Sequence, residues 1–261
     1  MFAQERRQII LAQLRKDGRV EVAALARRLG VSDETIRRDL TWLEETGQAV
    51  RTHGGALLRS LGALPLAERC AVSLEAKQAI GKLAAGLIQP GESVLIDSGS
   101  TGLEIARALN ARLEVSPAQT PDIHVVTNSL AVAVELANAP HVLVTVLGGT
   151  LRSAELCMVG PETVAALKRY RLDRVFLACA GIDLERGIAV ANPFEAEVKR
   201  AMLAGASQRI VAADGSKLGR TALVQIAGLD GIDLLITDRD ADVGTVAALR
   251  AAGLQVILPE E

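Results

Sequence analysis

The chain has 261 residues, of which 49% are hydrophobic, and its formal net charge is −2. This length suits one large globular domain, or a small domain followed by a medium one. The sequence shows no pattern of a signal peptide and no apolar run of about 18 residues, the length that a membrane span needs. We therefore expect a cytoplasmic protein with no membrane partner.

The cysteines argue against a disulfide framework and against a zinc site. There are three, Cys70, Cys157 and Cys179, and they are widely separated, with no CxxC pair. Such isolated cysteines are most often small buried side chains. We expect no bound metal and no cofactor.

Basic residues are concentrated at the front of the chain. Residues 1–60 contain eleven Lys or Arg against eight Asp or Glu, whereas residues 61–261 contain eighteen against twenty-three. A basic region favours a polyanionic partner, although a bias of this size is weak support by itself.

Apolar residues recur at helical spacing in three segments near the N-terminus, 3–16, 22–29 and 32–43. Gly30 ends the second segment, and Ser32 opens the third in the position of an N-cap. Two helices, a short glycine turn and a third helix follow one another as in a helix-turn-helix.

The run from 49 to 56 has extended character and a Gly-Gly pair near its end, which predicts a small β-wing. We therefore expect a winged helix-turn-helix over residues 1–57. Residues 58–74 lack a sustained period and are expected to form a linker.

The third helix of a helix-turn-helix lies in the major groove, and its first residues reach the base edges. If Ile36 and Leu40 face the core, Arg37 and Arg38 point outward, where arginine can contact guanine or phosphate. An Arg-Arg pair is more often a solvated helix face, but its place in this helix favours DNA binding. The candidate DNA contacts are Ser32, Thr35, Arg37 and Arg38 in the helix and Arg51 and His53 in the wing.

From residue 75 to 261, helical stretches alternate with short runs of Val, Ile and Leu, as at 94–96, 142–147 and 175–177. This alternation predicts an α/β domain built around a mainly parallel sheet that is buried on both faces.

A polar, glycine-containing segment follows the first of these strands. Asp97 ends the strand, and Ser98, Gly99, Ser100 and Thr101 lead into the next helix. Glycines let the backbone approach an anion, and the helix start offers free N–H groups, so the segment predicts a phosphate-binding loop. The alternative is a plain turn whose Ser and Thr side chains cap the helix.

Other strand ends carry similar residues, and ligands of open α/β sheets bind beyond the carboxyl ends of the strands. Asn128 follows one strand, and Gly148 and Gly149 follow another, so we expect these residues to contact a ligand, together with Asp97 and the loop at 98–101. Glu195 and Lys199 stand four residues apart on an expected helix, where a surface ion pair is the alternative interpretation.

Both halves of the chain resemble the DeoR family of bacterial sugar-catabolism regulators. The matching residues of the first half are Val31-Ser32, Thr35 to Leu40, Leu43-Glu44, Gly47 and Arg51 to Ala56. Those of the second half include Lys77, Ile80-Gly81, Asp97 to Thr101, Thr127 to Ser129, Leu147 to Gly149, Val159 to Pro161, Gly181 to Asp183, Lys199 to Met202, Ala213-Asp214, Ser216-Lys217 and Ile236 to Asp238.

The resemblance implies a sensor domain similar to ribose-5-phosphate isomerase and coenzyme A transferases, with a phosphorylated sugar or related phosphate ester as effector. It implies a phosphate loop at 98–101, with Ser100 where the family usually has Thr. It implies sugar contacts at Asn128, Asp183, Glu195, Lys199 and Lys217.

The leading hypothesis is a repressor that binds paired operator half-sites as a homodimer or larger homo-oligomer and is released when a sugar phosphate binds. The main alternative is a sugar-phosphate isomerase that uses Asp183, Glu195 and either Lys199 or Lys217 as acid and base. An isomerase needs no winged helix, so we expect no enzymatic activity. A DNA-binding architectural protein without a ligand is a third hypothesis, but it leaves the polar strand ends unexplained.

Overall fold

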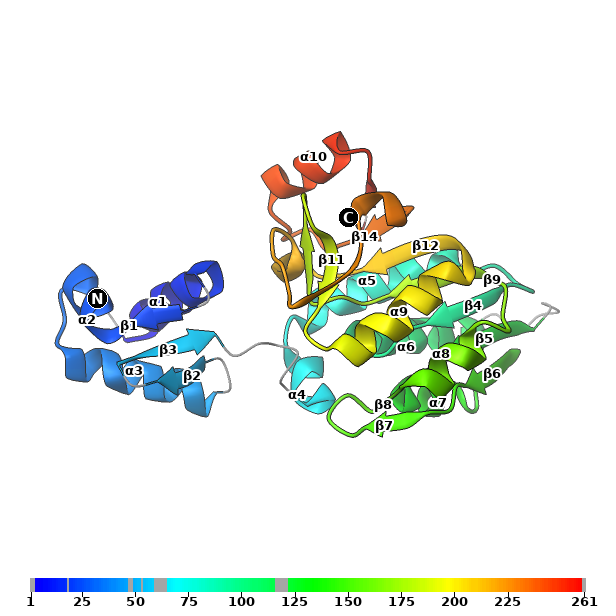
Figure 1. Cartoon of the computed structure of the whole chain (residues 1–261), viewed down its shortest axis with the longest axis horizontal. Helices are drawn as coiled ribbons and strands as arrows, with labels where there is room; N and C mark the ends of the chain where they lie inside the picture. Colours follow the sequence, from blue (N-terminus) through cyan, green and yellow to red (C-terminus); the bar gives the residue numbers. More distant parts are fainter. Residues whose placement is uncertain are drawn as a thin grey trace. The chain divides into compact units, whose positions relative to one another are not determined.

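The computed structural model describes residues 3–17, 19–46, 49–52, 54–58, 65–115 and 122–259 (Figure 1). The chain divides into two compact units, residues 1–64 and 65–261. Helix α4 (Leu66–Ala71), which lies inside the range expected to be a linker, is the first element of the second unit.

The first unit is a winged helix-turn-helix, as the sequence predicts. Its three strands form an antiparallel sheet in the order β1-β3-β2. The elements are α1 (Ala3–Asp17), β1 (Arg19–Glu21), α2 (Val22–Leu29), α3 (Asp33–Glu45), β2 (Ala49–Thr52) and β3 (Gly55–Leu58).

Local signals in the sequence set the helix boundaries of this unit. Gly30 ends α2 in the left-handed conformation, with φ of 66°. Ser32 caps α3 by accepting a hydrogen bond from the backbone N–H of Thr35. The apolar faces of the three helices meet in one core, in which Ile10, Leu14, Ile36, Leu40 and Leu43 are almost completely buried.

The second unit is an α/β domain with a seven-stranded sheet in the order β15-β14-β12-β9-β4-β5-β6. Every pair of neighbours in this sheet is parallel. The strands are β4 (Ser93–Ile96), β5 (Ile123–Thr127), β6 (Val142–Val146), β9 (Leu172–Leu177), β12 (Ala206–Ala212), β14 (Leu234–Ile236) and β15 (Gln255–Ile257). The predicted fold class is therefore confirmed.

Helices cover both faces of this sheet, which explains why its strands are apolar on both sides. Val94, Ile96 and Phe176 pack toward one set of helices, and the alternate residues Leu95 and Val175 pack toward the other. The first set is α5 (Leu74–Leu87), α6 (Ser100–Val115) and α7 (Leu130–Leu136), and the second is α8 (Pro161–Leu167), α9 (Pro193–Ala204) and α10 (Val243–Ala251).

Two small antiparallel sheets accompany the main one, and the sequence pattern does not predict them. One is the hairpin of β7 (Thr150–Arg152) and β8 (Cys157–Val159). The other joins β10 (Gly181–Asp183), β11 (Gly187–Val190) and β13 (Val224–Ala227). Short 3-10 turns lie at η2 (Gly215–Lys217) and η3 (Leu229–Gly231).

The strand order fixes where a ligand site is expected. From β4 the chain builds outward through β5 and β6, whereas from β9 it builds the other way through β12, β14 and β15. The order therefore reverses between β4 and β9, and ligands of open parallel sheets bind beyond the carboxyl ends of the strands at such a point. Asp97 and Ala178 follow these two strands directly.

Candidate DNA-binding surface and sensor site

The start of α3 carries Ser32 and Thr35, whose hydroxyl groups lie 2.9 Å apart. Ser32 also accepts the backbone N–H of Thr35 at 3.2 Å. Both hydroxyls therefore help to begin the helix, and the helix start remains a place where a phosphate can meet backbone N–H groups.

Arg37 and Arg38 lie on the exposed face of α3, as the apolar stripe predicts. Arg38 is 3.5 Å from Glu34, one turn earlier, and the two side chains are 80% and 68% exposed. An ion pair this exposed contributes little, so it leaves Arg38 available to another anion.

The wing residue Arg51 is attached to α3 in two ways. Its side-chain Nη1 donates to the hydroxyl of Thr41 at 3.2 Å, and its backbone N–H donates to Oε1 of Glu44 at 2.9 Å. The wing and the helix thus present one surface that includes Arg37, Thr41 and Arg51. His53, the other candidate in the wing, lies outside the described residues.

Asp39 has a role that the sequence patterns did not reveal. Its carboxylate is almost completely buried and binds Nε of Arg6 at 2.5 Å and Nε of Arg7 at 3.0 Å. Arg7 also stacks over Trp42, with its guanidinium carbon 4.4 Å from the ring centroid. These contacts fix α1 against α3. A signal in the sequence could have revealed this role of Asp39: it is an acidic residue on the apolar side of α3, and α1 offers two arginines as partners.

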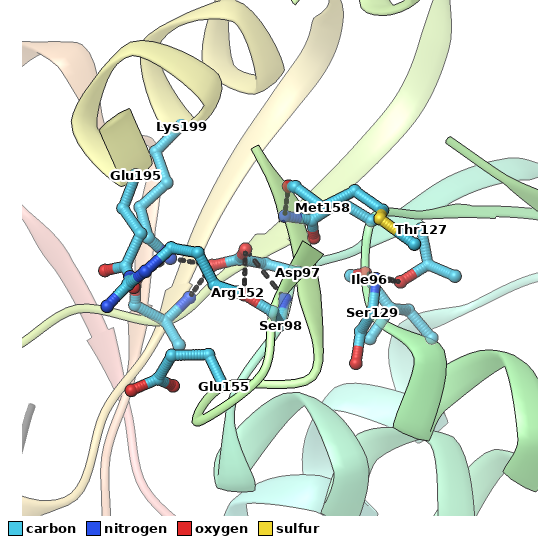
Figure 2. Close-up of polar contacts among 12 residues, drawn as sticks. Ile96, Asp97, Ser98, Thr127, Ser129, Arg152, Glu155, Met158, Glu195 and Lys199 are labelled. Atoms are coloured by element: carbon cyan, nitrogen blue, oxygen red, sulfur yellow. Dashed lines mark hydrogen bonds and ion pairs between the residues drawn. The ribbon is translucent and has the colours of Figure 1, made fainter. Parts of the chain in front are cut away.

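At the reversal point of the main sheet, Asp97 and Lys199 form a buried ion pair (Figure 2). Asp97 also accepts the N–H groups of Ser98 at 2.7 Å and Ala178 at 3.0 Å, and Lys199 donates to the carbonyl of Ala178 at 2.9 Å. Burial opposes the charge of Lys199, but the carboxylates of Asp97 and Glu195 outweigh it and raise the pKa of Lys199. The pair therefore joins α9 to the ends of β4 and β9.

The predicted phosphate loop follows Asp97 directly. Gly99 has φ of 111°, and a Cβ on Gly102 would lie 2.1 Å from the carbonyl oxygen of Asp97. The backbone thus turns tightly into α6, whose first residues, Ser100 and Thr101, are buried.

Asn128 lies at the end of β5, on the same edge of the sheet. Its side-chain nitrogen donates to the carbonyl of Met158 at 3.0 Å. Its side-chain oxygen is buried and has no hydrogen-bond partner among the described residues. A buried polar atom without a partner is unfavourable, so this acceptor is a candidate ligand contact.

Gly148 and Gly149 pack against α8. The carbonyl of Gly148 accepts the hydroxyl of Thr163 at 2.7 Å. Gly149 has φ of 145°, and a Cβ there would lie 2.1 Å from that hydroxyl oxygen. The structure thus gives Gly149 a packing position, whereas a Cβ on Gly148 would have no described atom within 4 Å beyond its neighbours in the chain.

The remaining candidates are divided between two places. Glu195 forms an ion pair with Arg152 of β7, and Figure 2 shows Glu195 and Lys199 projecting from α9 toward Arg152 and Asp97. Asp183 instead accepts the backbone N–H groups of Glu185 and Arg186 at 3.0 and 2.9 Å, so its carboxylate closes the turn between β10 and β11.

Lys217 belongs to the same charged region as Lys199. It lies 4.0 Å from Asp214, and burial lowers its pKa, with Asp214 acting in the opposite direction. Both lysines also act on the thiol of Cys179: desolvation raises the pKa of this thiol, while the charges of Lys199 and Lys217 oppose that rise.

Four further charged residues lie in this region and were not among the candidates. Arg69 of α4 pairs with Glu155, Lys77 of α5 donates to the backbone carbonyl of Arg69, and Arg152 pairs with Glu195. Arg69 falls in the range expected to be a linker, so the sequence offered no reason to place it in a ligand site. We call Asp97, Glu195, Lys199, Lys217, Arg69, Lys77, Arg152 and Glu155 the charged cluster.

Within the described ranges, no group of three or more His, Cys, Asp or Glu side chains is placed to hold a metal ion. Among the same residues, none of the helices combines the length and the apolar character that crossing a bilayer requires.

Family models match both units. Residues 6–60 match the DeoR-like helix-turn-helix domain, and residues 72–239 match the DeoR C-terminal sensor domain. The chain belongs to the DeoR family of transcriptional regulators. The resemblance described from the sequence motifs is therefore confirmed.

Curated relatives match over almost the whole chain. The HTH-type transcriptional repressor GlcR of Bacillus subtilis is 35% identical, over 100% of this chain and 98% of its own length. The HTH-type transcriptional regulator GlpR of Haloferax volcanii is 36% identical, over 98% and 97%. The chain is a DNA-binding regulator and not an enzyme, so the isomerase hypothesis is set aside.

Solved structures show more distant matches. Ribose 5-phosphate isomerase A from Methanocaldococcus jannaschii is 14% identical, over 57% of this chain and 55% of that chain, with a TM-score of 0.40. The full-length sorbitol operon regulator SorC from Klebsiella pneumoniae is 13% identical, over 93% and 98%, with a TM-score of 0.45.

Proposed function

We propose that this regulator is a repressor of a carbohydrate-catabolism operon and that a phosphorylated sugar, bound in its second unit, releases it from operator DNA. The observation that carries the proposal is the charged cluster at the reversal point of the sheet. Five of its members are cations: Arg69, Lys77, Arg152, Lys199 and Lys217. The predicted phosphate loop at 98–101 directly follows Asp97, a member of this cluster.

The chemistry of this region suits a phosphate ester. A phosphate group has oxygens that accept charge-assisted hydrogen bonds from Lys and Arg, and a helix start adds backbone N–H donors. We assign the phosphate group to residues 98–101 and the polar sugar hydroxyls to Asn128 and the carboxylates nearby. No cofactor enters this function.

For DNA, we propose that Ser32, Thr35, Arg37, Arg38, Arg51 and His53 contact the operator. Major-groove readers bind paired half-sites as two-fold assemblies, so we propose a homodimer or a larger homo-oligomer, acting in the cytoplasm where its DNA lies. Light scattering of the purified chain measures the mass of the assembly, and a monomer under conditions of specific binding contradicts this part.

The test is a fluorescence anisotropy titration of the purified full chain against its own upstream DNA at fixed salt, with and without a panel of sugar phosphates. We expect specific binding that one phosphate ester weakens and the matching free sugar does not. Arg37→Ala and Arg38→Ala should weaken DNA binding, whereas Arg186→Ala, an exposed arginine of the second unit, should not. Specific binding that no ester changes contradicts the effector assignment.

A further inference from the structure

Helix α4 is fixed to the β7–β8 hairpin of the sensor domain. The backbone N–H of Leu66, the first residue of the helix, donates to the carbonyl of Ala154 at 2.7 Å. The side chain of Arg69 forms an ion pair with Glu155, and the two side chains are only 18% and 6% exposed. A backbone contact and a largely buried ion pair therefore connect α4 to one short loop.

Lys77 of α5 fixes the other end of α4. Its ammonium group donates to the carbonyl oxygen of Arg69 at 2.7 Å and also to that of Val72. These carbonyls lie at the C-terminal end of α4, where that of Arg69 also accepts the backbone N–H of Val72 at 3.2 Å. The last carbonyls of a helix lack partners within the helix, so the Lys77 ammonium supplies a donor that this end needs. The position of α4 thus depends on two cations, Arg69 and Lys77, that both belong to the charged cluster.

Arg69 has unused capacity to bind an anion. Its Nε is buried and has no hydrogen-bond partner among the described residues. Burial lowers the pKa of Arg69, and the negative charge of Glu195 opposes this effect while the positive charge of Arg152 adds to it. Arg69 therefore lies close enough to the Arg152–Glu195 pair for those charges to affect its pKa. Its Nε–H still lacks an acceptor among the described residues.

We propose that Arg69 transmits effector binding to α4 by exchanging partners: an anion that enters the charged cluster replaces Glu155 on the Arg69 guanidinium, and α4 loses its ionic link to the β7–β8 hairpin. This inference rests on the proposed function in that it places an anionic effector in the cluster. A phosphate is a strong competitor, because it carries more charge than a carboxylate and can bind the guanidinium fork through two oxygens.

The exchange has a consequence for Glu155. This residue is 4% exposed, so a carboxylate that loses Arg69 is left buried without a counter-charge, which is unfavourable. The loop that carries Glu155 must then rearrange. Because α4 is the first described element after the DNA-binding unit along the chain, we expect a change in its attachment to affect DNA binding.

Linkage gives this mechanism a test that needs no ligand. If the anion and Glu155 compete for Arg69, removing the charge of Glu155 favours the same state that the anion favours. We therefore expect Glu155→Gln, in the full chain, to weaken binding to the upstream DNA by about 5- to 150-fold, the usual range of allosteric coupling. Glu197→Gln, which changes an exposed residue of α9, is the matched control and should bind as the wild type does.

A second measurement follows α4 directly. Hydrogen exchange of residues 66–72 in the wild type should become faster when inorganic phosphate saturates the protein, because the ionic link to Glu155 is lost. Arg69→Met should bind inorganic phosphate more weakly and show no such acceleration, and Glu155→Gln should bind it more tightly. Unchanged exchange in the wild type at saturating phosphate overturns the proposal.

The outcomes separate this inference from the proposed function. If a sugar phosphate releases the wild type from DNA while Glu155→Gln behaves like Glu197→Gln, the effector assignment stands and the exchange at Arg69 is wrong. If Glu155→Gln weakens DNA binding while no phosphate compound affects the wild type, the phosphate effector is wrong and the coupling of the Arg69–Glu155 pair to DNA binding is supported.

Discussion

Arg51 of the wing donates a hydrogen bond from Nη1 to the hydroxyl of Thr41 on α3, at 3.2 Å. The same hydroxyl donates to the backbone carbonyl of Arg37 at 2.9 Å, one turn earlier in the helix. Thr41 thus holds the wing arginine against the outward face of α3 before DNA arrives. A side chain that is already ordered loses less entropy on binding.

Thr41 should therefore support DNA binding through Arg51. Thr41→Val keeps the shape of the side chain but removes the hydroxyl, and we expect it to weaken operator binding by about 3- to 10-fold, the value of one hydrogen bond. Thr41→Ser keeps the hydroxyl and should restore binding. Anisotropy titrations of the three proteins at one salt concentration make the comparison, and equal affinity of the valine variant and the wild type would contradict it.

Asp39 should be a stability residue of the first unit. Asp39→Asn removes the charge that holds Arg6 and Arg7, and breaking a buried pair by removing one partner costs about 3 kcal/mol or more. Trp42 is the single tryptophan of the chain and stacks with Arg7, so its fluorescence reports unfolding of this unit alone. Asp33→Asn, an exposed residue at the start of α3, is the control and should change the free energy of unfolding by no more than about 1 kcal/mol, the value of a charge at a helix start.

Lys77 should make the second unit more stable as pH rises. Burial lowers the pKa of Lys77 from 10.5 to about 8, so between these values the unfolded chain holds a proton that the folded chain has released. The folded state then binds fewer protons, and the free energy of unfolding increases with pH across this window, by up to about 3 kcal/mol. Below pH 8 both states are protonated and the penalty is fully present.

The measurement compares the wild type with Lys77→Met by chemical denaturation from about pH 7 to about pH 10, which spans most of this window. The difference in unfolding free energy between the two proteins should change in favour of the wild type as pH rises, and other titrating groups cancel in this difference. A difference that does not vary with pH would show that burial does not control the charge of Lys77.

Much of the fold could be predicted from the sequence because its signals are local. The caps at Gly30 and Ser32, the apolar stripe of α3 and the alternation of apolar strands with helices all act within a few residues of one another. The loop after Asp97 was also found, because it follows its strand directly in the chain.

The charged cluster could be predicted only in part, because its pairings join residues that are far apart in the sequence. Arg69 and Glu155 are 86 residues apart, and Lys199 and Asp97 are 102 apart. Neither α4 nor the β7–β8 hairpin has a strong periodic pattern, so nothing local marked Arg69 or Glu155. The resemblance assigned Asp183 to the sugar, but its place at a hairpin turn could have been predicted from the short Asp183 to Gly187 segment, since Asp commonly accepts backbone N–H groups in turns.

Gly148 and Gly149 were both predicted to contact the ligand, and the structure gives a way to separate packing from binding. A Cβ on Gly149 would lie 2.1 Å from Oγ1 of Thr163 and 2.7 Å from the carbonyl oxygen of Val159, in a backbone conformation that disfavours L side chains. We expect Gly149→Ala to lower the free energy of unfolding of the second unit by about 2 kcal/mol or more. A Cβ on Gly148, by contrast, would have no described atom within 4 Å beyond its neighbours in the chain.

Gly148→Ala is therefore the matched control, and it should leave the stability of the second unit within about 0.5 kcal/mol of the wild type. Thermal denaturation of the two variants measures this difference. Titration with inorganic phosphate then separates the roles: if Gly148→Ala folds normally but loses phosphate affinity, the backbone at this turn contacts the ligand, because the added methyl group occupies that open space. If Gly149→Ala proves as stable as the wild type, the prediction is wrong, and the close contact of this turn with α8 does not require a glycine.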